Sequence, residues 1–489
     1  MGRYAWLTVW VLTTCAVARA QVGGNPQPAA VGSNVQRFDR QLEQIRQYTT
    51  LMADQEVPAG RRALFDYGGW FTPAYLSLDD FNNNTHVLRQ YDLFYYGRLN
   101  FDGAHEFYVR GRTTYFDFNP GDSFDGEGSR QETILDRAYY RFDLQRAMAA
   151  YQGKSITDNL VFQGGRELIY WANGLVLNQV LDGAVLQGSV GSFDMQILAG
   201  LTPVSTTVDF DSSRPNFDDH TRRGFFGAMI ADNIGTHKPY VYILSQRDYN
   251  SPETLLTGPI TTRFDYNSYY IGGGSTGSIG DKLLYGAELA FEAGHGLSNS
   301  FTTAGGALAQ VPQTRDPISA FGADVRLDYL FADDHKSRAS AEVILATGDK
   351  DRRTTSNTFG GNKSHTYDDA FNAFGLLNTG LAFNPTISNL MALRLGASTF
   401  PVPSSDFFGG MQAGFDLFVY GKFTNGAPID EPALGSGQFL GLEPDVYVNW
   451  QIASDVTLAL RYGAFFPNDQ VIANPRIRQF LYAGVTFAF

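Results

Sequence analysis

Cysteine is almost absent from this sequence of 489 residues, because Cys15 is the only one. Residues 1–20 hold an early arginine, a short apolar run over 5–17 and an Ala-Arg-Ala end. These three parts are typical of a secretory signal peptide cleaved near Ala20, and the apolar run is too short to remain as a spanning helix. Cleavage would remove Cys15, which excludes disulfides, thiolate catalysis and cysteine-ligated metals from the mature chain.

Long apolar runs and an excess of positive charge are also missing. After the leader, no stretch approaches the roughly 20 apolar residues that a membrane-spanning helix needs. The chain has 37 Lys and Arg residues against 50 Asp and Glu residues, and removing the leader would take away two more arginines and no acid. A net-acidic chain of this length argues against nucleic-acid binding.

Candidate catalytic groups are sparse. The seven histidines, among them His86, His105, His220 and His365, fall mostly in expected loops or turns, with no serine at a readable spacing. Membrane phospholipases built on barrels need such a pairing of nucleophile and base. We therefore expect no enzyme and no catalytic residue.

Two acidic stretches, 122–127 and 211–219, gather the oxygen ligands that calcium prefers. Neither has the ordered spacing of a calcium-binding loop. We therefore expect solvated acidic loops there, and we expect the protein to carry no cofactor.

Aromatic residues and glycine are abundant by contrast. The chain contains 26 Tyr, 38 Phe and 52 Gly, and its mean hydropathy is −0.20. This composition fits alternating strands with aromatic girdles at the membrane interfaces better than it fits a helical membrane protein.

The C-terminal segment 478–489 shows the alternation most clearly. Its apolar positions are every second residue, namely Leu481, Ala483, Val485, Phe487 and Phe489. Strict period-2 patterning indicates a strand with one continuous apolar face. A chain that ends on Phe in this way resembles the closing strand of a bacterial outer-membrane barrel, although the pattern alone also allows an edge strand of a soluble sheet.

The same alternation recurs from residue 65 onward and predicts eighteen strands. They are expected at 65–76, 88–101, 105–117, 134–143, 159–166, 181–190, 193–202, 223–232, 239–247, 261–271, 282–292, 318–330, 338–347, 388–398, 410–422, 438–451, 456–465 and 478–489. Odd-to-even links are long, and the longest is 348–387. Even-to-odd links are mostly tight turns, with 144–158 as the exception.

An even strand number with alternating long loops and tight turns is the pattern of bacterial outer-membrane barrels. A soluble sandwich would allow the same two-faced strands. The leader, the terminal Phe489 and the loop alternation together favour the membrane barrel, whose closure also removes exposed sheet edges. We predict an all-β, eighteen-stranded antiparallel transmembrane barrel over 61–489, in contact with outer-membrane lipids.

The segment 21–60, between leader and barrel, predicts a linker followed by one helix. Residues 21–33 are rich in Gly, Pro and Ala, which is typical of a flexible linker. Apolar residues then recur at helical spacing over about four turns, at Val35, Phe38, Leu42, Ile45 and Met52. We expect this helix in the periplasm, against the barrel base, a sister chain or another periplasmic partner.

Three stretches carry a resemblance to a known family. Residues 162–186 contain Phe-Gln-Gly-Gly-Arg-Glu-Leu, Gly-Leu-Val-Leu and Leu-Asp-Gly-Ala-Val-Leu, residues 346–350 read Ala-Thr-Gly-Asp-Lys, and 440–467 form a candidate hairpin. In these stretches the sequence resembles the alginate export porin family, over roughly residues 60–489. The resemblance implies an eighteen-stranded outer-membrane channel that exports an anionic polyuronate through a basic lumen.

If the polar strand faces line a lumen, ten basic residues form a candidate substrate-binding set. They are Arg98, Arg110, Arg112, Arg137, Arg141, Arg166, Arg326, Arg394, Lys422 and Arg461. Guanidinium groups match carboxylates bidentately, and rings of such groups set anion selectivity in pores. Strict alternation places Arg166 toward lipid, so it joins the set only if a bulge at 164–165 turns it inward.

Acidic residues on the same faces supply the opposing interpretation. Cross-strand ion pairs would neutralise the wall and merely stiffen it. The acids in question are Asp92, Glu106, Asp143, Asp324, Asp328 and Glu342.

We therefore predict an outer-membrane diffusion channel, for an anionic polysaccharide such as alginate or for another anionic solute. A general small-solute porin and a barrel-anchored surface or adhesive protein are the alternatives. The loop 348–387 is expected to fold over or into the lumen, because it is long and carries an apolar patch around Phe371 and Phe374.

Overall fold

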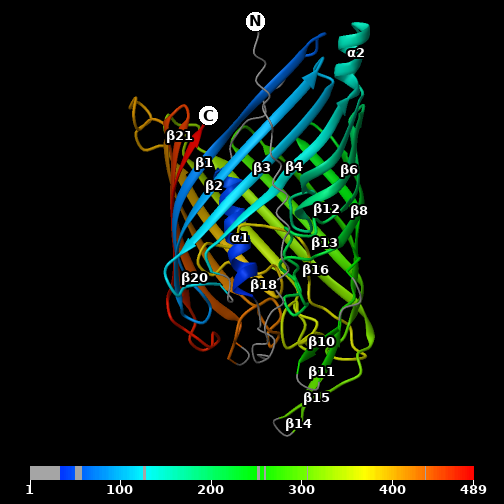
Figure 1. Ribbon diagram of the computed structural model, residues 1–489, viewed down its shortest axis with the longest axis vertical. Helices are drawn as coiled ribbons and strands as arrows, with labels where there is room; N and C mark the ends of the chain where they lie inside the picture. The colour runs from blue at the N-terminus through cyan, green and yellow to red at the C-terminus, as the bar shows by residue number, and fades with distance from the viewer. Residues whose placement is uncertain are drawn as a thin grey trace, which may run out of the picture.

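The computed structural model describes residues 33–49, 58–124, 128–250, 254–257, 260–304, 307–434 and 437–489. The predicted signal peptide, nearly all of the predicted linker and Met52 lie outside these residues. Within the described part of the chain, eighteen strands form one antiparallel sheet, and β1 pairs with both β2 and β22, so the sheet closes into a barrel (Figure 1).

The strands of the barrel follow one another in chain order around the wall. They are β1 (Ala63–Asp79), β2 (Thr85–Phe101), β3 (His105–Phe118), β4 (Arg130–Asp143), β5 (Asn159–Tyr170), β6 (Asn178–Val190), β7 (Phe193–Leu201), β8 (Arg223–Asp232), β9 (His237–Asp248), β12 (Tyr266–Ile279), β13 (Leu283–Leu297), β16 (Arg315–Leu330), β17 (Arg338–Ala346), β18 (Leu390–Thr399), β19 (Met411–Gly421), β20 (Phe439–Ala453), β21 (Val456–Pro467) and β22 (Arg478–Ala488). The predicted eighteen-stranded barrel is confirmed.

The tenth strand is displaced from its predicted range of 261–271. Residues 260–263 belong to a small hairpin of β10 (Thr254–Thr257) and β11 (Ile260–Arg263), and the barrel strand continues instead to Ile279. Gly272 and Gly274 interrupt the apolar alternation there. A Cβ at either glycine would lie within 2.5 Å of the Tyr242 or Tyr240 side chain, so these glycines make room for inward-pointing rings.

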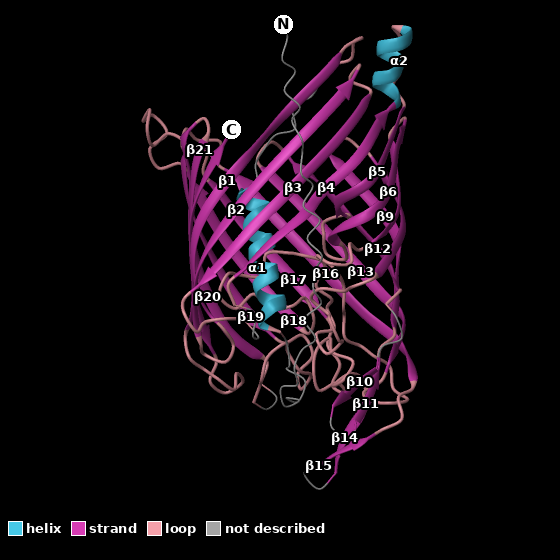
Figure 2. Cartoon of the chain, in the orientation of Figure 1, coloured by secondary structure: helices cyan, strands magenta, loops and turns pink. Residues whose placement is uncertain are grey.

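A second small hairpin joins β14 (Phe301–Ala304) and β15 (Ala307–Gln310) within the long link that follows β13. Both hairpins lie beyond one end of the barrel, opposite the end that carries helix α2 (Leu144–Gln152) (Figure 2). By the usual rule for bacterial barrels, the end with long loops is extracellular and the end with tight turns is periplasmic.

The two ends of the barrel sequence meet at the seam between β1 and β22. The Gly69 and Phe489 backbones exchange two hydrogen bonds, each with an N–O distance of 2.9 Å. A Cβ at Gly69 would lie 3.0 Å from the Phe489 ring and closer still to the Phe94 carbonyl, so glycine allows the terminal residue to dock. The terminal Phe therefore takes part in closing the barrel.

Helix α2 accounts for the exceptional link 144–158. Asp143 caps it by accepting a 3.0 Å hydrogen bond from the Arg146 N–H, and Gly153 ends it with a left-handed φ of 66°. Asp143 thus serves as a helix cap on the periplasmic rim. Of the helices in the described residues, none has the length and apolar character to cross a membrane.

The predicted N-terminal helix exists as α1 (Asn34–Thr49), but its expected place on the barrel base is wrong. It lies inside the barrel (Figure 1). Its apolar stripe of Phe38, Leu42 and Ile45 is buried in a core with residues of both the barrel wall and the loop 347–389. A hydrogen bond also anchors the polar side of the helix, since Gln41 Nε2 donates to the Leu381 carbonyl at 2.6 Å.

The long loop 347–389 between β17 and β18, here called the inward loop, folds into the lumen. Three consecutive backbone N–H groups, those of Leu381, Ala382 and Phe383, donate to the Glu443 carboxylate of β20 at 2.6–2.8 Å. The Asn372 N–H donates to Glu292 of β13 at 2.8 Å. Carboxylates on two separate strands of the wall, β13 and β20, therefore anchor this loop in the lumen.

The tip of the β5–β6 hairpin, residues 171–177, also turns into the barrel. Its large apolar side chains, Trp171, Leu175, Val176 and Leu177, are fully buried. The Asn173 N–H donates to Glu288 of β13 at 2.9 Å. The Asn178 N–H donates to the Phe374 carbonyl of the inward loop at 2.8 Å. Helix α1, the hairpin tip and the inward loop together constrict the lumen.

Candidate functional site

A cavity of about 580 Å³ lies between the β1–β4 wall, α1 and the β5–β6 hairpin. We call it the arginine cavity, because Arg98, Arg110, Arg112 and Arg137 line it together with Arg46 of α1. Strand alternation brings these four wall arginines to the inner face of three adjacent strands. Aromatic rings, including Trp70, Phe94, Tyr96, Tyr108 and Tyr139, fill the space between them.

Two of the wall arginines are fixed by carboxylates. Arg98 Nε donates to Glu106 at 2.9 Å, and Arg110 Nε donates to Asp136 at 2.7 Å. The Arg110 guanidinium also lies 5.5 Å from the Trp70 ring centroid and 5.6 Å from that of Phe94. Cation–π contacts of this kind hold the group in place while leaving part of its charge available.

Asp136 enters the site through a β-bulge. Across from β3, Arg110 pairs with Arg137 and Gly111 pairs with Leu135, so Asp136 is an extra residue in β4. A bulge puts two successive side chains near the same face. Asp136 and Arg137 therefore both line the arginine cavity, whereas simple alternation along β4 would turn one of them outward.

Arg112 and Arg137 are less neutralised than their neighbours. Among the described residues, Arg112 makes no ion pair, and the one carboxylate that Arg137 approaches is Asp136, with an N–O distance of 4.0 Å. Helix α1 adds Arg46 and Glu43 to the same cavity, 3.8 Å apart. The two wall arginines are therefore the cations best placed to receive a carboxylate ligand.

A second cavity, of about 480 Å³, holds two further predicted arginines near the opposite wall. Arg394 bridges Glu342 and Asp416, with N–O distances of 2.9 and 2.8 Å. Arg326 lies 2.9 Å from Asp328. In this part of the lumen, the ion-pair interpretation describes the arrangement better than an open basic surface does.

The other predicted residues lie apart from both cavities. Arg461 is built into the wall, where it donates to Asn449 at 2.6 Å and to two backbone carbonyls. Lys422 is buried just beyond β19, and this burial lowers its pKa. Arg141 pairs in register with Glu106 in the β3–β4 ladder and does not line either cavity.

The expectation that a bulge turns Arg166 inward is wrong. Gly165 has a left-handed φ of 136°, but Arg166 remains on the outer face, where it forms a bidentate pair with Asp182 at 2.6 and 2.7 Å. The glycine is needed for another reason, because a Cβ there would lie 2.2 Å from the Ala138 carbonyl oxygen of β4.

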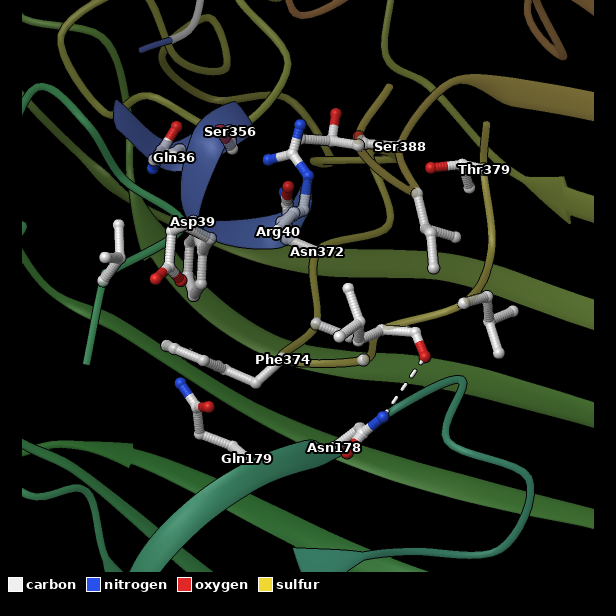
Figure 3. A pocket seen from close by; sticks show the side chains of 18 of the residues that line it. Gln36, Asp39, Arg40, Asn178, Gln179, Ser356, Asn372, Phe374, Thr379 and Ser388 are labelled. Atoms are coloured by element: carbon white, nitrogen blue, oxygen red, sulfur yellow. Dashed lines mark hydrogen bonds between the residues drawn. The ribbon is translucent and has the colours of Figure 1, made fainter. Parts of the chain in front are cut away.

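A narrower pocket of about 120 Å³ separates α1 from the inward loop (Figure 3). Gln36, Asp39 and Arg40 reach it from α1, and Phe374 faces them from the inward loop. Burial raises the pKa of Asp39 to about 6, partly opposed by Arg46, and burial lowers the pKa of Arg40 to about 10. Sequence reasoning missed these lumen residues because it placed the helix outside the barrel.

The acidic stretch 211–219 has a structural use. The Asp211 carboxylate accepts hydrogen bonds from Ser213 and from the Thr358 N–H of the inward loop. Among the described residues, no three His, Cys, Asp or Glu side chains are grouped so that they could hold a metal ion. Residues 125–127 of the other acidic stretch lie outside the described residues.

Three comparisons relate the chain to known proteins. The sequence model of the family described as alginate export matches residues 123–480. No curated protein sequence matches the chain. Similar solved structures include three from Pseudomonas aeruginosa: OccK11 (OpdR), OccK8 (OprE), and OpdK with vanillate.

OccK11 is 12% identical with a TM-score of 0.48, and the match covers 90% of this chain and 99% of that one. OccK8 is 10% identical with a TM-score of 0.48, covering 87% and 98%. OpdK is 11% identical with a TM-score of 0.47, also covering 87% and 98%. The family match spans well over half of the sequence, and the chain belongs to the alginate export family of outer-membrane channels.

Proposed function

We propose that this channel passes anionic solutes, and that an anionic polysaccharide such as alginate is its preferred cargo. Family membership supports a channel for such a polymer. The observation that carries the proposal is the pair Arg112 and Arg137 in the arginine cavity. Among the described residues, Arg112 makes no ion pair, and Arg137 approaches one carboxylate, that of Asp136, at 4.0 Å. A uronate carboxylate would supply what these two guanidinium groups lack.

The charge balance of the cavity makes this pair decisive. Five arginines and five acidic side chains line it, so it has no large net charge. Glu106 and Asp136 are already committed to Arg98 and Arg110. Attraction for an anion therefore depends on which guanidinium groups remain accessible, not on the number of arginines.

The constricted lumen strengthens the effect of each remaining charge. Two unit charges about 4 Å apart interact by about 1 kcal/mol in bulk water, and by about 4 kcal/mol at an effective dielectric constant near 20. Helix α1 and the β5–β6 hairpin narrow the space beside Arg112. A carboxylate held there would be favoured more strongly than one in a wide aqueous pore.

The test is block of single-channel current by an oligouronate in planar bilayers. The double variant Arg112→Ser/Arg137→Ser should raise the half-blocking concentration about tenfold or more relative to the unaltered channel, since it removes two charge-assisted contacts. Arg326→Ser, on the opposite wall, is the matched control and should change it little. Equal block in all three channels would refute the proposal.

The alternatives give different outcomes in the same assay. A general small-solute porin would conduct without oligouronate block, and a barrel that only anchors surface loops would show no stable conductance. Cation selectivity of an open channel would favour the acidic wall residues as the selectivity determinants.

A further inference from the structure

The barrel wall is interrupted between β4 and β5. Their ladder pairs Asp143 with Val161 at the periplasmic end and stops at Ala138 with Arg166. Strand β4 nevertheless continues along β3 as far as Arg130. Within the described part of the chain, no strand pairs with β4 over 130–137 on the side that faces β5.

The strands that would complete the wall bend inward at this height. The β6–β7 ladder likewise begins only at Asp182, opposite Leu201, so residues 178–181 of β6 are not paired with β7. The hairpin tip beyond them crosses the lumen to Glu288 on β13. The opening is therefore bordered by β4 on one side and by the end of β7 on the other.

The arginine cavity reaches β5 and β6 beside this opening. By strand alternation, Leu168 and Tyr170 share a face of β5 with Phe162, which points outward toward the lipid. Both residues nevertheless line the arginine cavity, together with Val180 of β6. Residues from both faces of β5, Glu167 on one and Leu168 on the other, therefore line the cavity beside the opening.

The rim of the opening is suited to hydrocarbon. Leu135 on β4 and Leu201 on β7 are each 45% exposed on the outer face. An unpaired strand edge is costly in a bilayer because its polar groups lack partners. Arg166 reduces that cost at the base of the opening, where its Nη1 donates to the Leu135 carbonyl at 3.0 Å while Asp182 neutralises its charge.

We infer that this opening is a side portal that takes the apolar part of an anionic amphiphile, such as a long-chain carboxylate. The head group binds Arg112 and Arg137, and the chain lies along Leu168 and Val180 toward the bilayer. The inference rests on the arginine cavity used in the proposed function, but it assigns that cavity a second class of ligand. It also gives such a ligand a route between the bilayer and the cavity that avoids the constriction made by the inward loop.

The first test asks whether the cavity is open to lipid. The predicted mature chain has no cysteine, so single cysteines can be introduced at Leu168, Phe162 and Gln163 and labelled with bimane in the reconstituted barrel. Brominated lipids and aqueous iodide should both quench the label at 168. Lipid alone should quench it at 162 on the outer face, and iodide alone at 163 on the inner face. A label at 168 that only one of the two quenchers reaches would overturn the portal.

The second test measures ligand class with dodecanoate as the probe and butyrate as its short-chain control. Dodecanoate should block the channel at a concentration about tenfold or more below that of butyrate, since burying even part of its chain contributes over 1 kcal/mol. Leu168→Gln should remove most of this difference. Equal block by both acids in the unaltered channel, or no effect of Leu168→Gln, would overturn the inference.

Oligouronate block separates this inference from the proposed function. Leu168→Gln should weaken block by dodecanoate far more than block by oligouronate, whereas Arg112→Ser should weaken block by both. A channel that dodecanoate blocks in the predicted way but oligouronate does not would retain the portal and refute the polysaccharide proposal. Heat-modifiable migration of each variant shows that the barrel has assembled.

Discussion

At the scale of single residues, the lumen arginines differ in how completely carboxylates neutralise them. Arg394 bridges two carboxylates, Arg98 and Arg110 have one each, and Arg137 approaches Asp136 at 4.0 Å. The contribution of each arginine to anion selectivity should be larger the less it is neutralised, because a fully paired guanidinium attracts a passing anion only weakly.

Asp136→Asn is the single substitution that tests this dependence of ion selectivity most directly. It should raise the ratio of anion to cation permeability severalfold, because it removes the carboxylate that holds Arg110 and approaches Arg137. The measurement is the reversal potential in a salt gradient. Asp66→Asn, in the same cavity on β1, is a control for the loss of a negative charge. An unchanged ratio in Asp136→Asn would mean that these arginines do not face the conduction path.

Asp39 on α1 should make the stability of the helix in its packed position depend on pH. Its pKa is about 6 in the folded chain against an ordinary 3.8, mainly because of burial, so the folded state favours the protonated carboxyl. The stabilisation is fully present below about pH 4 and is lost as pH rises through 6.

We therefore predict that protease cleavage within α1 becomes faster between pH 5 and pH 7.5. Asp39→Asn, which cannot ionise, should flatten this dependence. The same pH profile in both proteins would show that a different group is responsible.

Alternation in the sequence placed Arg98, Arg110 and Arg112 on one face of β2 and β3, and all three line the arginine cavity. It could not reveal Asp136, since a bulge changes which side chains point inward without changing the composition of the strand. Strict alternation placed Arg166 on the outer face, where it lies. The bulge that was expected to turn it inward does not do so. Asp39, Glu43 and Arg46 were missed because their helix was placed outside the barrel.

At the scale of elements, strands were predictable because each has one face in lipid, which forces a period of two. The apolar stripe of α1 was equally clear, but amphipathicity does not say which apolar surface a helix will cover. That surface is formed by wall residues and by an inward loop that contacts the helix only after both have folded into the lumen. The contacts between the helix and the inward loop join residues more than three hundred positions apart and leave no local signal.

The inward loop should limit the conductance of the channel. Deleting 355–384 should raise single-channel conductance about twofold or more, because the segment lies in the lumen, where Glu292 and Glu443 hold it. Removing the β14–β15 hairpin over 301–310, outside the barrel sheet, should leave conductance unchanged. A loop deletion with unaltered conductance would show that the permeation path does not pass the loop.

At the scale of the whole molecule, the barrel reverses the arrangement of a soluble protein, since apolar side chains cover its outside and polar side chains lie within. Strand β9 shows the rule, since Val241 and Ile243 are about 60% exposed while Tyr242 between them is buried against Glu288. Only a closed sheet can present such strands to lipid with all of its backbone groups paired. The inward β5–β6 hairpin is the place where this rule is relaxed.

Leu93→Arg tests the assignment of faces. Leu93 lies on the outer face of β2, and arginine there should cost about 2–4 kcal/mol if the position is near the bilayer midplane. Tyr96→Arg, on the inner face of the same strand, should cost far less. Reversible unfolding from lipid vesicles in denaturant measures both. Equal costs would contradict the outward assignment.

The most direct test of the central claim is the ion selectivity of the reconstituted channel. The reversal potential across a bilayer with a tenfold gradient of potassium chloride reports the ratio of chloride to potassium permeability. An arginine cavity with Arg112 and Arg137 accessible predicts a ratio above one that falls as ionic strength rises, because salt screens exposed charges. A ratio below one at every salt concentration would contradict the account.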